Sequence, residues 1–121
     1  MPQYLIYFNQ QWVGDHPPEW YGTRVEPSMA VVNEMREAGV WLFGGGLEEP
    51  DSGARIFSAD ATSGTPMITE GPYAETTEQL GGFCAIEVSD DAEAEKWALK
   101  VAEGCGWPQE VRRIKTEPDL D

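Results

Sequence analysis

The stretch Gly82-Phe83-Cys84-Ala85-Ile86-Glu87-Val88 decides the fold, because it is the clearest strand in the chain. Apolar side chains at most of its positions are typical of a strand inside a sheet. A helix is expected directly after it, capped by Ser89 or Asp90, since Asp90 and Glu93 have the spacing of a capping box. The predicted helix ends at Gly104. Its apolar face consists of Ala94, Trp97, Ala98 and Val101.

The N-terminal half predicts the same succession of strand, helix and strand. Residues 3–8 form the first strand, and a segment rich in aromatic side chains follows over residues 9–25. A helix is expected from Pro27 to Ala38, because proline suits the first helical turn and Gly39 suits a left-handed exit. A short strand over residues 40–43 follows, and the glycines at 44–46 end it.

A β-hairpin is predicted between the two halves. Its arms are residues 55–58 and 66–69, and the polar segment between them contains Gly64 for the turn. Residues 110–115 supply the closing strand. The order of elements predicts an α+β fold, a ferredoxin-like βαββαβ antiparallel sheet with an inserted β-hairpin and both helices on one face.

The length and composition of the chain predict one domain. A chain of 121 residues that is 40% hydrophobic is large enough for a single core. No linker divides it, so we expect a single domain over residues 1–116 and a flexible acidic tail over residues 117–121.

Both faces of the predicted sheet are apolar, although two helices cover only one. In the first strand, Tyr4, Ile6 and Phe8 alternate with Leu5 and Tyr7. A sheet face exposed to water is normally polar. The pattern therefore predicts a homodimer in which the uncovered faces of two sheets meet.

The charge and the cysteine content exclude several classes of partner. The net charge is −14, with 22 acidic against 8 basic side chains, so neither nucleic acid nor a membrane surface is an expected partner. No apolar stretch reaches the ~20 residues of a membrane span. The chain has no leader-like N-terminus, and Cys84 and Cys105 are expected to be reduced thiols, so the prediction is a cytoplasmic protein.

The connection Thr69-Glu70-Gly71-Pro72-Tyr73-Ala74-Glu75, followed by Glu78-Gln79-Leu80-Gly81-Gly82-Phe83, carries a family resemblance. With the order of elements, it resembles the YCII-related family, in the branch named for an Asp-Gly-Pro-Phe signature. Trp97 and Ala38-Gly39-Val40 also stand where that family places them. The resemblance implies a subunit of the dimeric α/β-barrel type, usually a homodimer. It implies no particular reaction.

Three departures from the family pattern bear on activity. The signature aspartate is Glu70 here, and the signature phenylalanine is Tyr73. Better-studied relatives suggest a His–Asp pair with the histidine on the first helix, but the single histidine of this chain, His16, lies in the preceding loop. The chain therefore does not support hydrolysis through that pair.

Glu70 is the leading candidate for a catalytic residue. The Gly71-Pro72 turn would display its carboxylate at a strand end, and aromatic neighbours would exclude water and raise its pKa for proton transfer. The structural alternative is that Glu70 only closes its turn, although glutamate does this less well than aspartate. Tyr73 would add a hydroxyl that orients the ligand, unless it is simply bonded to a carbonyl.

The opposite wall of the expected cleft would come from the aromatic segment. Trp20 or Arg24 is predicted there, with Trp12 and Glu75 as further ligand-binding candidates. Arg24 would neutralise Glu70 or hold an anionic ligand, unless it forms a surface ion pair. The leading hypothesis is an enzyme that transfers a proton on a small metabolite. The alternative is a non-catalytic small-ligand-binding or accessory protein of the same fold.

No cofactor or metal is predicted. The glycines at 44–46 are not followed by the helix that a phosphate-cradling loop needs. No cluster of histidine, cysteine or acidic residues has the spacing of metal ligands.

Overall fold

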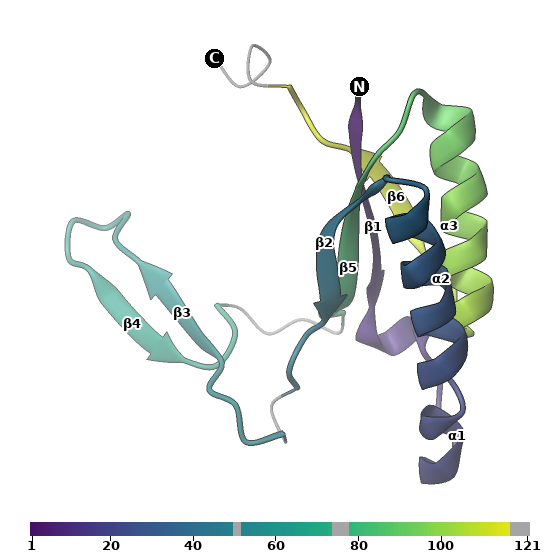
Figure 1. Cartoon of the computed structure of the whole chain (residues 1–121). Coiled ribbons are helices and arrows are strands. Elements are labelled where there is room, and N and C mark those ends of the chain that lie inside the picture. The colour runs from purple at the N-terminus through teal and green to yellow at the C-terminus, as the bar shows by residue number, and fades with distance from the viewer. Residues whose placement is uncertain (50–51, 74–77, 117–121) are drawn as a thin grey trace.

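The computed structural model describes residues 1–49, 52–73 and 78–116 (Figure 1). Strands β1, β2, β5 and β6 form one antiparallel sheet in the order β2-β5-β1-β6. Figure 1 shows α2 and α3 side by side on one face of this sheet. The chain is thus α+β with two main helices, and this arrangement is compatible with a ferredoxin-like fold. The elements are β1 (Gln3–Asn9), η1 (Gln10–Trp12), α1 (Pro18–Gly22), α2 (Val25–Glu37), β2 (Trp41–Gly46), β3 (Phe57–Asp60), β4 (Met67–Glu70), β5 (Leu80–Glu87), α3 (Asp91–Cys105) and β6 (Glu110–Arg113).

The hydrophobic core lies between the sheet and the two helices. Ile6, Met35 and Ile86 are its most completely buried large side chains, with exposed fractions of 1% or less. Burial of each such side chain contributes about 1.5–3 kcal/mol relative to leaving it in water. The remaining core residues are Tyr4, Cys84, Val88, Ala94 and Trp97.

Helix α3 starts as the sequence predicts but ends later. One of the two hydrogen bonds of the predicted capping box is confirmed: the Asp90 side chain accepts a hydrogen bond from the Glu93 N–H. The predicted stop at Gly104 is wrong: α3 continues to Cys105 and is capped by Gly106 with φ +97°. A Cβ at Gly104 would lie 2.8 Å from Val31 Cγ2, so this glycine allows α2 and α3 to approach closely.

The predicted aromatic loop contains two short helices. Pro18 occupies the first turn of α1, where its missing N–H leaves no hydrogen bond unmade. Helix α2 begins at Val25, two residues before the predicted Pro27. Pro27 still falls in the first turn, where backbone N–H groups have no partner within the helix.

Strand β2 runs through the glycines that were expected to end it. The predicted end at residue 43 is wrong, because Gly44, Gly45 and Gly46 pair with Cys84, Phe83 and Gly82 of β5. A bulge between Trp41 and Phe43 shifts the register. A Cβ at Gly44 would lie 2.4 Å from the Phe83 carbonyl oxygen, so only glycine lets β2 lie this close to β5. The closing strand β6 ends at Arg113, two residues before the predicted bound.

The hairpin is confirmed as an antiparallel pair of β3 and β4, with each arm displaced slightly toward the C-terminus. It forms a sheet of its own. Figure 1 shows it projecting away from the main sheet on the side opposite the helices.

We call the second side of the main sheet the open face. Strand alternation and the β1–β5 and β2–β5 registers place Leu5, Tyr7, Phe43, Phe83 and Ala85 there. Phe43 is 60% exposed and meets Phe83 edge to face, with ring centroids 5.6 Å apart. No helix of the described residues lies on this side of the sheet (Figure 1).

Candidate functional site

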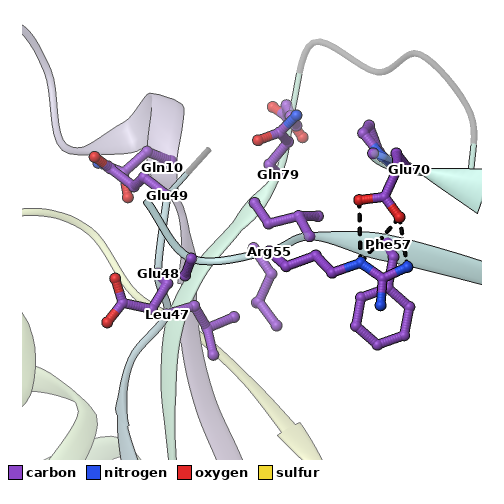
Figure 2. A pocket seen from close by; sticks show the side chains of 14 residues that line it. Gln10, Leu47, Glu48, Glu49, Arg55, Phe57, Glu70 and Gln79 are labelled. Atoms are coloured by element: carbon purple, nitrogen blue, oxygen red, sulfur yellow. Dashed lines mark hydrogen bonds and ion pairs between the residues drawn. The ribbon is translucent and has the colours of Figure 1, made fainter. Parts of the chain in front are cut away.

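A groove lies between the base of the hairpin and the segments that lead into β3 and β5. Its volume is about 1040 Å³, at the upper end of the range for small-molecule sites. Figure 2 shows Glu70 and Arg55 on one side, with Gln10, Glu49 and Gln79 across from them. Its described lining residues are Gln10, Leu47, Glu48, Glu49, Ala54, Arg55, Ile56, Phe57, Glu70, Gly71, Pro72, Glu78, Gln79 and Leu80.

Glu70 and Arg55 form a forked ion pair on the wall of this groove. Arg55 Nε donates to both carboxylate oxygens of Glu70, at 3.1 and 2.9 Å, and Nη2 donates to Oε2 at 2.5 Å (Figure 2). The guanidinium also lies over the Phe57 ring, 4.2 Å from its centroid. These hydrogen bonds raise the pKa of Arg55 above its usual range.

The turn after β4 does not depend on the Glu70 carboxylate. Gly71 adopts φ +91°, and its N–H donates to the Ile56 carbonyl at 2.8 Å. Ser58 Oγ donates to the Gly71 carbonyl at 2.7 Å. The backbone of the hairpin and one hydroxyl therefore close the turn, which leaves the Glu70 side chain to Arg55.

The water-excluded setting expected for Glu70 is wrong. Its side chain is 68% exposed, because the groove is open and its partner Arg55 is itself exposed. Tyr73 is 76% exposed and does not line the groove. Glu75 lies outside the described residues.

The structure separates the aromatic-segment candidates from Glu70. Trp20 stacks on His16 with ring centroids 3.5 Å apart, and it is not among the residues that line the groove. Arg24 Nε and Nη2 donate to the carbonyls of Cys105 at 3.0 Å and Gly104 at 2.9 Å, so Arg24 binds the C-terminal end of α3. Trp12 is half-buried in η1, away from the groove lining.

The groove is acidic. Glu48, Glu49 and Glu78 line it together with Glu70, and Arg55 is the single basic residue among its described lining residues. Glu78 also accepts a hydrogen bond from Asn9 Nδ2 at 3.1 Å. An excess of carboxylates favours a cationic ligand over an anionic one.

Sequence reasoning missed Arg55 and Phe57, which it assigned only to a hairpin arm. The missing information was the register of the hairpin, in which Phe57 pairs with Glu70 across β3 and β4. An arginine two positions before that pair lies on the same side of the strand and within reach of the carboxylate.

Among the described residues, no group of three or more histidine, cysteine or acidic side chains could hold a metal ion. The described helices include none with the length and apolar character needed to cross a membrane.

Comparison with protein-family models identifies a known domain in the chain. The model of the YCII-related domain matches residues 22–105, which is more than half of the chain. No curated protein matches the sequence. The matched segment includes α2, the hairpin, β5 and α3, and therefore most of the groove.

Proposed function

We propose that this chain, which belongs to the YCII-related domain family, binds a small organic cation in the acidic groove beside the hairpin. Glu70 is the anionic contact and Phe57 is the aromatic floor. The observation that carries this proposal is the position of Arg55, whose guanidinium lies between the Phe57 ring and the Glu70 carboxylate.

Arg55 occupies the groove as a ligand cation would. A planar cation is attracted to an aromatic face and forms forked hydrogen bonds with a carboxylate. The side chains of Arg55 and Glu70 are 56% and 68% exposed, so water screens the ion pair and its net contribution is small. A ligand cation therefore displaces Arg55 at little cost and takes over both of its contacts.

Proton transfer by Glu70, the leading hypothesis from the sequence, fits the geometry less well. Arg55 uses both carboxylate oxygens, and solvent reaches the group. A general base works best when it is shielded from water and free to accept a proton. Binding without turnover is therefore the preferred function. Tyr73, which follows the turn, is proposed to contact the part of the ligand outside the groove.

The test uses benzamidine, a planar cation, and benzamide, its neutral analogue, in calorimetric titrations. Benzamidine is expected to bind and benzamide to bind at least ~10-fold more weakly, because only the cation pairs with Glu70. The Glu70→Gln variant should bind benzamidine ~10-fold more weakly than the wild type. Arg55→Ala should tighten it, because the internal competitor is removed.

A matched control is Glu37→Gln, which makes the same charge change at an exposed position outside the groove lining. Benzamidine affinity should stay within twofold of the wild type in this variant. The proposal is wrong if benzamide binds as well as benzamidine, or if Arg55→Ala weakens the binding of the cation.

We further propose that two copies assemble through their open faces as a dimeric α/β barrel, and that the chain belongs to the Asp-Gly-Pro-Phe branch. Phe43, which is 60% exposed, and the half-buried Tyr7 and Phe83 on the open face support the assembly, since apolar patches left open to solvent mark interaction surfaces. The turn at Gly71 supports the assignment to that branch.

Cys84 and Cys105 are free thiols, which supports a reducing compartment, the cytoplasm. Residues 1–116 are taken as one domain; residues 117–121 lie outside the described residues.

A further inference from the structure

A second cavity lies between the helices and the main sheet. We call it the interior cavity. Its volume is about 350 Å³, near the lower end of the range for small-molecule sites. It shares no described lining residue with the acidic groove. Its described lining residues are Ile6, Phe8, Tyr21, Arg24, Val25, Ser28, Met29, Val32, Met35, Trp41, Gly45, Gly46, Phe83, Cys84, Val101, Cys105, Trp107 and Gln109.

The mouth of the interior cavity is apolar. Tyr21, Val25 and Met29 line the cavity and are 40%, 61% and 43% exposed, so they border its opening to solvent. Val25 and Met29 belong to α2, which lies on the side of the sheet opposite the open face (Figure 1). The dimer proposed above joins open faces, so it leaves this mouth uncovered. An occupant that shields these side chains from water is therefore favoured by the hydrophobic effect.

The wall of the interior cavity offers few polar side-chain groups to an occupant. Arg24 is the only charged residue among the described lining residues, and its Nε and Nη2 donate to carbonyls at the C-terminal end of α3. The partial negative charge of that helix end offsets the guanidinium. Ser28 Oγ donates to the Val25 carbonyl at 3.0 Å. Trp107 Nε1 and Gln109 Nε2 each have less than 1 Å² of accessible surface, so an occupant cannot reach them.

The rest of the wall favours an aromatic occupant. Phe8, Trp41 and Trp107 bring rings to it, and the ring centroids of Phe8 and Trp107 lie 5.1 Å apart. Burial raises the pKa of the Cys84 thiol to about 12 and also raises that of Cys105, so both groups stay neutral. Water in such a cavity makes few hydrogen bonds, so an apolar molecule displaces it at little cost. An aromatic molecule gains further by packing edge to face or offset on these rings.

We propose that the interior cavity binds a neutral aromatic molecule with the dimensions of two fused rings. The rings lie among Phe8, Trp41 and Trp107, and the outer edge of the molecule covers Val25 and Met29 at the mouth. A charged molecule is disfavoured, because it would lose its hydration without a compensating partner. This site is separate from the acidic groove and does not rest on the function proposed for that groove.

The test compares 2-naphthol, which is uncharged near neutral pH, with 2-naphthoate and 2-naphthylmethylammonium, which carry a negative and a positive charge on the same ring system. Binding is followed by NMR on ¹⁵N-labelled protein, through the indole N–H signals. 2-Naphthol should shift the signals of Trp41 and Trp107 in a saturable way, because both residues line the cavity. The signals of Trp12 and Trp97, which lie outside the lining, should stay in place. By the same signals, both charged analogues should bind at least ~10-fold more weakly.

A pair of variants tests the mouth of the cavity. Met29→Glu places a carboxylate at the mouth and should weaken the binding of 2-naphthol at least ~10-fold. Because Met29 is 43% exposed, the variant should keep its fold, which circular dichroism checks. Leu99→Glu is the matched control, since it makes the same kind of change at a 72% exposed helical position outside the cavity lining. It should bind 2-naphthol as the wild type does.

A further variant, Val32→Trp, should fill the cavity and abolish the saturable shifts. The proposal is overturned if either charged analogue binds as tightly as 2-naphthol, or if 2-naphthol gives no saturable shift of Trp41 and Trp107 up to ~1 mM. Equal effects of Met29→Glu and Leu99→Glu would also overturn it. Equal shifts of all four indole signals would mean unspecific association with the surface, which is a further contradicting result.

Discussion

Replacing Gly44 by alanine should destabilise the protein strongly, whereas the same change at the neighbouring Gly45 should not. A Cβ at Gly44 would lie 2.4 Å from the Phe83 carbonyl oxygen and 2.5 Å from Cys84 Cα. Ordinary contact at these atoms is 3.4–4 Å, so β2 would have to move away from β5 by about 1 Å. At Gly45 a Cβ would meet nothing within 4 Å.

The magnitude follows from what the new methyl group strikes. Overpacking typically costs about 1–3 kcal/mol, and here the obstacle is the backbone of a central strand that β1 holds from the other side. We therefore expect Gly44→Ala to lower the free energy of unfolding by about 3 kcal/mol, which corresponds to a fall in Tm of roughly 10 °C. Gly45→Ala should change stability by less than ~1 kcal/mol, in the stabilising direction, because alanine restricts the unfolded chain.

Urea unfolding followed by tryptophan fluorescence and circular dichroism measures both variants under the same conditions. The midpoint should fall for Gly44→Ala with an unchanged m-value, since the surface exposed on unfolding is the same. Equal effects of the two variants, or a loss below ~0.5 kcal/mol for Gly44→Ala, would refute the close pairing of β2 and β5 described above.

Two further predictions concern assembly and pH. Sedimentation at micromolar concentration should give twice the 13.4 kDa chain mass, and Phe43→Lys on the open face should give monomers, because a charge there would be buried without a partner; a wild-type monomer would exclude the dimer. Since burial raises the pKa of Cys84 from 9.0 to about 12, its contribution to stability is complete below pH 9 and is lost as the pH rises toward 12. Between pH 9 and 10, urea titrations should show the wild type losing about 1 kcal/mol more than Cys84→Ala, and parallel losses in the two proteins would contradict the assignment.

The elements with strong local signals were predictable from the sequence. The apolar run of β5 and the Asp90 cap of α3 are both local features, and the structure has them. The glycines show where local reading fails. Gly104 and Gly44 were interpreted as ends of elements, but each permits a close approach to a segment distant in the sequence. The residue type alone does not distinguish these two uses of glycine.

The candidate site was predictable only in part. The turn at Gly71 pointed to Glu70, and the structure places Glu70 on a groove. Its partner Arg55 was missed because the pair depends on the register of the hairpin, which propensity does not fix.

The hairpin gives the groove a wall of low stability. Strands β3 and β4 form a sheet of only two strands, and such a hairpin in water is marginally stable by itself. Phe57, Met67 and Ile68 are each more than half exposed, so the hairpin gains little from burial. Opening of this wall therefore requires far less free energy than global unfolding. A ligand in the proposed site would therefore set the conformation of the hairpin wall, while the main sheet keeps its shape.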